Sequence, residues 1–206
     1  MSALYRGLLM SRVYQPLSRR PLLAGVQLQY PVPPGEPVRL DSPALQVMTD
    51  LRKIPAATID TDAPLDAANR FMIRRGVRLL LVTDDRRQVL GLITATDILG
   101  ERPVTFAVER VVNRQDILVH DIMTPRERLE VLWHAELVGA EVGHVVATLK
   151  ATGRQHALVA ETGADGAGQT VRGIFSLSQI ARQLGVTIAS TEVASTFAEI
   201  EAALGR

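Results

Sequence analysis

Two nine-residue stretches of the chain carry the same pattern of residues. Residues 91–99 read GLITATDIL and residues 173–181 read GIFSLSQIA, and the two align without a gap. In each, an apolar run after a glycine gives way to hydroxyl residues, which is typical of a strand that ends where a helix begins. The one change of charge is Asp97, which aligns with Gln179. A sequence pattern that occurs twice in one chain predicts an internal structural repeat.

The repeat extends on the N-terminal side of both stretches. VMTDLRK at 47–53 matches IMTPRER at 122–128, and RGVRLLLVTD at 75–84 matches TGRQHALVAE at 152–161. Each copy therefore spans roughly 60 residues, the size of one small supersecondary unit. The additional residues of the second copy are expected in its loops, where insertions cost little.

Local signals predict the order strand, helix, strand, strand, helix in both copies. The first copy has strand patterns at 56–60, 78–83 and 89–93, and the second at 129–133, 156–160 and 170–175. The first helix of each copy is expected to stop at Gly76 or Gly153, and that of the second copy to run through Val138 and Val142. Because neither copy alone buries enough apolar surface for comfortable stability, we expect the two to pack face to face in a mixed α/β (α+β) fold.

Three further segments flank or join the copies. Seven of the eleven prolines lie within residues 1–43, which predicts an extended arm over 1–41. The copies then occupy 42–103 and 122–186, joined by a linker with helical apolar spacing at 104–121. Residues 187–206 complete the chain, with a last helix expected at 193–204.

Composition excludes several classes of function. The 206 residues include no cysteine and only four scattered histidines, so we expect no disulfide, thiolate chemistry or metal site. The net charge is +1 without a long basic run, so bulk nucleic-acid affinity is not implied. No apolar run is long enough for a membrane helix, and no secretory signal is recognisable, so a cytoplasmic location is expected.

No local catalytic motif is present, and we expect no enzymatic activity. The stretch GADGAGQT at 163–170 resembles a phosphate loop, but Gln169 stands where that loop requires lysine. A strand pattern follows it instead of the helix that a phosphate loop needs, so we interpret it as a hairpin loop.

The repeated stretch itself is the better candidate for a binding site. Thr94, Thr96 and Asp97 place two hydroxyls and a carboxylate at the expected start of a helix. Such groups can bind a phosphate and a ribose diol. They can equally serve as helix caps, and the residues alone leave both interpretations open.

The paired units, each introduced by an apolar-Met-Thr signature (Val47-Met48-Thr49 and Ile122-Met123-Thr124), resemble a tandem of CBS domains. The resemblance covers about residues 42–186. It implies two β-α-β-β-α motifs packed as one pseudo-two-fold Bateman module, commonly a homodimer, with the arm and the last helix outside it.

The resemblance also implies ligand-binding residues. In members that bind adenine nucleotides, a Ser/Thr-x-x-Asp element contacts the ligand, which corresponds here to Thr94 and Asp97 with Thr96 beside them. The family places adenine near positions such as Ile54, Pro55 and Val77. A phosphate contact is implied for Arg78. The corresponding second site would comprise Ser176, Ser178, Arg154 and His156, although His156 is equally well explained as a structural histidine.

The loss of the acid at Gln179 predicts an asymmetry between the two sites. A charge-assisted hydrogen bond contributes about 1.5 to 3 kcal/mol, so we expect adenosyl ligands to bind the second copy about ten- to a hundredfold more weakly. The resulting hypothesis is a regulatory module that senses AMP, ADP, ATP or adenosylmethionine in the cleft of the first copy and signals to an unknown effector protein or through self-association. The alternative is a scaffold that binds no ligand and only dimerises.

Overall fold

The computed structural model describes residues 37–163, 166, 168–186 and 193–204, together with Arg19, Pro21 and Val26. The chain divides into Met1–Gly35 and Glu36–Arg206. Most of the arm predicted at 1–41 lies outside the described residues, so its conformation stays a prediction. No helix in the described part of the chain has the length and apolar character that a bilayer span requires.

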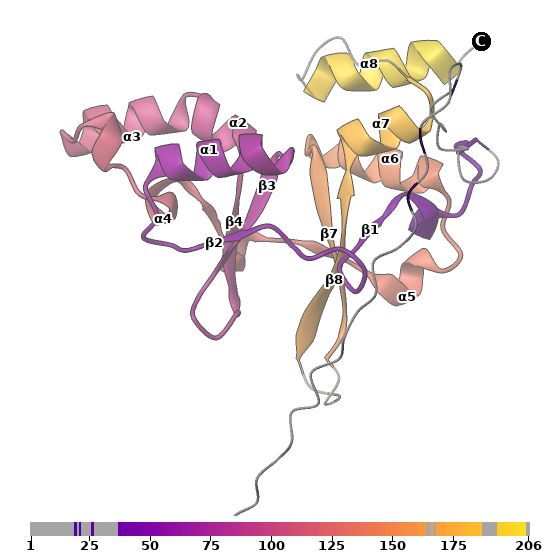
Figure 1. Cartoon of the computed structure of the whole chain (residues 1–206), viewed down its shortest axis with the longest axis horizontal. Coiled ribbons are helices and arrows are strands. Elements are labelled where there is room, and N and C mark those ends of the chain that lie inside the picture. The colour runs from indigo at the N-terminus through magenta and orange to yellow at the C-terminus, as the bar shows by residue number, and fades with distance from the viewer. Residues whose placement is uncertain are drawn as a thin grey trace, which may run out of the picture. The chain divides into compact units, whose positions relative to one another are not determined.

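Two four-stranded mixed sheets form the framework of Glu36–Arg206 (Figure 1). The first has the order β2-β3-β4-β5, with bounds Thr58–Ile59, Leu79–Thr83, Val89–Thr94 and Thr124–Pro125. The second has the order β6-β7-β8-β1, with bounds Val131–Trp133, His156–Thr162, Gln169–Ser176 and Thr49–Asp50. In each sheet the first pair is parallel and the other two pairs are antiparallel. The predicted duplication is therefore present in the topology.

The two repeats exchange their Met-Thr segments. Strand β1 of the first repeat pairs with β8 of the second, and β5 of the second repeat pairs with β4 of the first. The registers are equivalent, since Thr49 lies opposite Ile174 and Thr124 lies opposite Leu92. Sequence analysis did not anticipate this exchange, which ties each repeat to the edge of the other sheet.

The exchange explains the glycine that begins each repeated stretch. A Cβ atom at Gly91 would lie 2.5 Å from the carbonyl oxygen of Thr124 and 3.1 Å from the Sδ of Met123. At Gly173, a Cβ atom would collide with the side chain of Met48, including its Cγ at 2.7 Å. The glycine of each repeat thus leaves room for the exchanged Met-Thr segment of the other.

Helices cover the outer side of each sheet. Figure 1 shows α1, α2 and α3 gathered over the first sheet, and α6, α7 and α8 over the second. The helices run α1 Leu65–Arg75, α2 Ala95–Leu99, α3 Arg102–Arg110, α4 Val119–Ile122, α5 His134–Leu137, α6 Val142–Thr152, α7 Leu177–Gln183 and α8 Val193–Leu204. Short 3-10 helices occupy Ala44–Val47, Arg114–Asp116 and Arg126–Arg128.

Several helix boundaries follow the sequence signals. Gly76 and Gly153 end α1 and α6 with a φ of 63° each, the left-handed conformation that glycine adopts without strain. The predicted last helix at 193–204 is confirmed as α8. The prediction that the helix of the second repeat includes Val138 is wrong: α6 begins at Val142, and Val138 lies exposed after the separate helix α5.

Strand β3 shows how the sheets are buried on both faces. Side chains alternate along a strand, so Leu80 and Val82 point to the helices while Leu79 and Leu81 point the other way. Leu79 and Leu81 pack with Leu158 of β7 in a core between the two sheets. The uninterrupted apolar run of β3 therefore serves two cores.

A separate core lies between the second sheet and its helices. It contains Phe175 of β8, which is fully buried, and Phe197 and Ile200 from α8. The C-terminal helix thus packs against the second repeat, because its apolar side covers that core.

An ion pair fixes the exchanged strand β1. Both nitrogens Nη1 and Nη2 of Arg172 donate to the carboxylate of Asp50, with 3.0 Å between Nη2 and Oδ2. The backbone N–H of Arg52 also donates to Asp50 Oδ1 at 2.8 Å. These hydrogen bonds, foremost those of Arg172, lower the pKa of Asp50 from 3.8 to about 2. At the equivalent positions the first sheet has Pro125 and Leu90, so the ion pair is specific to β1.

Acidification should release this restraint in a defined pH window. Since the folded-state pKa of Asp50 lies below its ordinary value, its contribution to stability is complete above pH 3.8 and is lost as the pH falls to about 2. Urea unfolding between pH 4.5 and 2 measures the loss. An Asp50→Asn variant should be less stable than the wild type at pH 4.5 and should lose less stability on acidification; equal losses would contradict the assignment.

Candidate functional site

Two cavities lie between the sheets, and each is lined by both repeats. We name the first the Asp97 cleft; its volume is about 340 Å³. We name the second the arginine cleft; its volume is about 1120 Å³. Leu79 and His156 line both cavities, which places these two residues between them.

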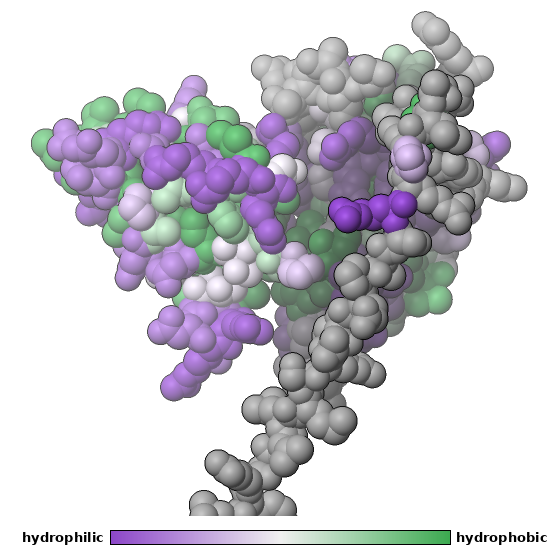
Figure 2. Space-filling model, viewed as in Figure 1, coloured by the Kyte–Doolittle hydropathy of each residue, from purple (hydrophilic) through white to green (hydrophobic). Residues whose placement is uncertain are grey.

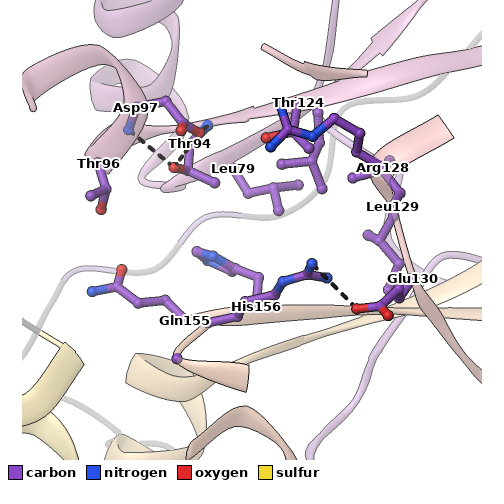
Figure 3. A pocket seen from close by; sticks show the side chains of 14 residues that line it. Leu79, Thr94, Thr96, Asp97, Thr124, Arg128, Leu129, Glu130, Gln155 and His156 are labelled. Atoms are coloured by element: carbon purple, nitrogen blue, oxygen red, sulfur yellow. Dashed lines mark hydrogen bonds and ion pairs between the residues drawn. The ribbon is translucent and has the colours of Figure 1, made fainter. Parts of the chain in front are cut away.

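In the Asp97 cleft, the start of α2 faces the start of β7. Figure 3 shows Thr94, Thr96 and Asp97 on one side and Gln155 and His156 on the other. Four further polar residues line the cleft: Thr124, Arg128, Glu130 and Arg154. The first repeat thus supplies Thr94, Thr96 and Asp97, and the second repeat supplies the other polar groups of the lining.

The arginine cleft has the equivalent construction with the repeats reversed. Ser176, Ser178 and Gln179 of the second repeat lie across from the segment around Arg78 in the first. Three more arginines line this cavity: Arg74 and Arg75 at the end of α1, and Arg182 on α7.

The structure separates residues that sequence analysis placed in one site. Of the predicted adenosyl site, Thr94, Thr96 and Asp97 line the Asp97 cleft. The remaining predicted residues line the arginine cleft: Ile54, Pro55, Val77 and Arg78. The predicted second site is divided in the same way, since Ser176 and Ser178 line the arginine cleft, Arg154 lines the Asp97 cleft and His156 lines both.

The face-to-face packing of the sheets is the physical reason for this division. The start of the last helix in one repeat faces the start of the second strand of the other repeat, whereas the prediction grouped both segments by repeat. Sequence analysis also missed Arg128 and Glu130, which follow the second Met-Thr signature. These two residues could not be assigned to the cleft without knowing that β5, which precedes them, pairs with β4 of the first sheet.

The carboxylate of Asp97 caps α2. The backbone N–H of Thr94 donates to Asp97 Oδ2 at 2.9 Å, and the N–H of Asp97 donates to Thr94 Oγ1 at 3.2 Å. Asp97 Oδ1 accepts from Arg102 Nη1 at 2.7 Å. The capping interpretation is therefore confirmed. A carboxylate oxygen can accept more than one hydrogen bond, so capping does not exhaust the acceptor capacity of Asp97.

Gln179 makes a different contact at the equivalent position. Thr49 Oγ1 of the exchanged strand β1 donates to Gln179 Oε1 at 3.2 Å. The hydroxyls of Ser176 and Ser178 lie 3.1 Å apart, and Ser176 makes no side-chain cap to α7. The replacement of the acid thus removes the capping box and leaves neutral polar groups at this side of the arginine cleft.

The two clefts differ in charge. Two arginines and two carboxylates line the Asp97 cleft, and within it Arg154 and Glu130 form an ion pair at 3.3 Å. Four arginines and no carboxylate line the arginine cleft among the residues that the structure describes. The formal charges therefore cancel in the first cleft and accumulate in the second.

His156 is a neutral imidazole between the clefts. Burial among protein atoms lowers its pKa to about 4, and the positive charge of Arg78 lowers it further, against the opposing effect of Asp97. At pH 7 it can therefore donate or accept a hydrogen bond without adding charge to either cleft. Within the described ranges, histidine and carboxylate side chains form no group that could hold a metal ion.

Comparison with known proteins identifies the first repeat. Residues 44–103 match the family model of the CBS domain. A curated relative, the uncharacterized protein MK0525 of Methanopyrus kandleri, is 30% identical over 61 residues, which are 30% of this chain and 31% of that protein. The chain thus matches about a third of the length of this relative.

A solved structure shares the fold of this chain. An uncharacterized conserved protein from Pyrococcus horikoshii superimposes with a TM-score of 0.52 at 21% identity, covering 75% of this chain and all of that one. CBSX2, a CBS-pair protein of Arabidopsis thaliana crystallised with AMP, has a TM-score of 0.49 at 19% identity and covers 68% of this chain and 94% of its own. The first repeat therefore matches the CBS domain, and the chain resembles the tandem CBS-domain proteins in that its two repeats form two sheets of equivalent topology.

Proposed function

We propose that this protein is a regulatory module that binds an adenosine-containing ligand in the Asp97 cleft. The observation that carries the proposal is the arrangement of complementary groups across one cavity: the Thr94 and Thr96 hydroxyls and the Asp97 carboxylate on one side, Arg128 and Arg154 in the same lining. A carboxylate can accept both hydrogen bonds of a ribose diol, and arginine pairs with phosphate or carboxylate. The volume of about 340 Å³ lies within the range of about 300 to 1,000 Å³ typical of small-ligand sites.

The balance of charges favours ligands of low net charge. Because Glu130 already pairs with Arg154 and Asp97 adds a second negative charge, the cleft has little excess positive charge for a triphosphate. AMP or adenosylmethionine therefore fits the lining better than ADP or ATP. The proposal assigns no catalytic residue, and the apolar walls Leu79, Leu92 and Leu158 serve to exclude water from the ligand.

The contacts of Arg102 suggest how binding could be transmitted. Arg102 is the first residue of α3 and joins Asp97 Oδ1 to the carbonyl oxygen of Met123, at 2.7 and 3.4 Å. A ligand diol that takes up Asp97 Oδ1 competes with Arg102 and loosens α3. The outer side of α3 carries Val104 and Val108, which are 59% and 74% exposed. Figure 2 shows exposed hydrophobic residues in the region of α2 and α3. An effector protein or a second copy of the chain would bind α3 and respond to this change in its position.

Calorimetric titration with AMP, ADP, ATP and adenosylmethionine tests the proposal. We expect about one site per chain, with affinity lowered about ten- to a hundredfold by Asp97→Asn, because the variant loses the charge that strengthens hydrogen bonds to the ribose. Asp121→Asn is the matched control: Asp121 Oδ2 accepts from the backbone N–H of Leu118 at 2.9 Å and caps α4, but Asp121 lines neither cleft. Equal effects of the two variants would contradict the assignment.

A scaffold without a ligand is the second candidate function. The observation that favours it is the use of both Asp97 oxygens within the protein, one by the cap and one by Arg102. It predicts that folded wild-type protein binds none of the four ligands while retaining self-association, as measured by sedimentation.

A further inference from the structure

We propose that Glu130 determines the class of ligand that the Asp97 cleft accepts: an adenosyl compound with a zwitterionic amino-acid end, and not a nucleotide with a chain of phosphates. The inference rests on the proposed function, because it concerns the same cleft. It adds the residue that recognises the end of the ligand remote from the ribose.

Glu130 and Arg154 present opposite charges next to each other in the lining of the Asp97 cleft. Nη2 of Arg154 lies 3.3 Å from Oε2 of Glu130, and Figure 3 marks this ion pair with a dashed line. An α-amino acid carries an ammonium group and a carboxylate on one carbon atom. A carboxylate side chain accepts hydrogen bonds from an ammonium group, and a guanidinium donates paired N–H groups to a carboxylate. The ion pair therefore offers one partner to each charge of an amino-acid group.

The ion pair lies away from the groups that would hold the ribose. Figure 3 shows Glu130 well apart from Thr94, Thr96 and Asp97, beyond the side chain of Leu129. A ligand whose diol is bound by Asp97 can therefore extend its other end to Glu130. Recognition of the ribose and recognition of the remote end are thus assigned to different residues.

The ion pair is open to solvent, so a ligand can enter it. The side chains of Arg154 and Glu130 are 44% and 78% exposed. Ion pairs with this exposure contribute little to stability, because water screens the charges and both side chains lose conformational freedom. An amino-acid group can separate the two side chains and give each of them a new partner. A phosphate can pair with Arg154 only by displacing Glu130, whose charge then repels it.

The arginine cleft has apolar side chains at the equivalent positions. Glu130 directly precedes β6 and Arg154 lies two residues before β7, and Ala57 and Val77 have the same places before β2 and β3. Both Ala57 and Val77 line the arginine cleft. The repeated fold therefore does not require charged residues at these positions, and the pair of Glu130 with Arg154 distinguishes the Asp97 cleft.

Calorimetric titration of wild type and Glu130→Gln with adenosylhomocysteine, methylthioadenosine and ATP tests the inference. The first two ligands are thioethers of the same adenosine, and the amino-acid group is present in adenosylhomocysteine alone. In Glu130→Gln, the affinity for adenosylhomocysteine should fall about tenfold, because its ammonium group loses a charged partner. The affinity for ATP should rise about tenfold, because Arg154 is released and a negative charge is removed. Methylthioadenosine should bind both proteins equally well.

Glu127→Gln and a double variant complete the experiment. Glu127 also forms an ion pair, at 3.1 Å with Arg126, but lines neither cleft, so Glu127→Gln should leave all three affinities unchanged. Adding Arg154→Gln to Glu130→Gln should abolish the gain in ATP affinity, because that gain depends on the released guanidinium. A general defect in folding would lower the affinity for every ligand, whereas the inference requires changes of opposite sign.

The outcomes separate this inference from the proposed function. Asp97→Asn should weaken all three ligands, since each has the same ribose. If it does, while Glu130→Gln changes no affinity or changes all three in one direction, the proposed function stands and the inference is overturned. An effect of Glu127→Gln as large as that of Glu130→Gln overturns it as well. If neither wild type nor Glu130→Gln binds any of the three ligands, the proposed function fails and the inference fails with it.

Discussion

Replacing Gly91 by alanine should lower the free energy of unfolding by about 3 kcal/mol, because the new methyl group has no space. Its Cβ would lie 2.5 Å from the carbonyl oxygen of Thr124 and 3.3 Å from the Cα of Pro125. Both are backbone atoms of the exchanged strand β5, which cannot rotate away as a side chain can. The strand must separate from β4, and the second repeat loses its pairing with the first sheet. Urea unfolding measures the change.

Gly173→Ala is the matched control, since Gly173 occupies the equivalent position in the second repeat. There the three atoms nearest to the added Cβ all belong to the Met48 side chain. Methionine is flexible and can adopt another rotamer, so we expect a smaller loss of about 1 kcal/mol. Equal losses in the two variants would show that the carbonyl of Thr124 moves as freely as a methionine side chain, and the argument from backbone contact would then be wrong.

The fold class could be predicted because many residues of the two repeats have strong local preferences for helix, strand or turn. The apolar run of β3, the two left-handed glycines at the ends of α1 and α6, and the apolar spacing of α8 all indicate their elements without tertiary information. Agreement of two copies at every step then makes each interpretation more secure than either copy would alone.

The exchange of strands could not be predicted from the same signals. Strands β1 and β5 each have two residues, too few to show a period, and their partners lie more than a hundred and about thirty positions away respectively. Met48 and Met123 were useful as markers of the repeat, but nothing local indicates which sheet they join. The structure shows that the glycine of each repeat contacts the methionine of the other repeat.

This gap explains why the prediction grouped residues that line different cavities. Thr94 and Asp97 were correctly seen as neighbours because they are three residues apart in one helix start. Their association with Val77 and Arg78 assumed that a site belongs to one repeat, and the packing of the sheets places those residues in the other cavity. In the sequence, Arg74 and Arg75 are explained as favourable charges at the C-terminus of α1. Their position in the lining of a cleft was therefore not predicted.

Acidification from pH 7 to pH 4 should cost about 3 kcal/mol of stability through His156 alone. Its pKa is about 4 in the folded protein and 6.5 ordinarily, so the unfolded chain binds a proton first as the pH falls. The contribution of the neutral imidazole is therefore complete above pH 6.5 and is lost between pH 6.5 and 4. This window lies above that of Asp50, so the two groups can be separated by urea unfolding at stepwise pH.

His156→Leu should remove this pH dependence. Leucine is the residue at the equivalent position, Leu79, and His156 shares the lining of the Asp97 cleft with Leu79, Leu92 and Leu158, so the variant is expected to fold. Its free energy of unfolding should change less than that of the wild type between pH 7 and 4, by about 3 kcal/mol. An equal loss in the two proteins would show that the imidazole of His156 is not held neutral by the fold.

Arg78 and Asp97 shift the pKa of His156 in opposite directions. The position of His156 between the two clefts can therefore be tested with a variant in either cleft. Arg78 lowers the pKa of His156, so Arg78→Gln should raise it and reduce the loss of stability on acidification. Asp97 raises the pKa, so Asp97→Asn should lower it and enlarge the loss. Shifts in the same direction would contradict the placement of His156 between a positive and a negative cleft. Opposite shifts would establish that the charge of each cleft is felt at one shared residue, and that an anion bound beside Arg78 must favour protonation of His156.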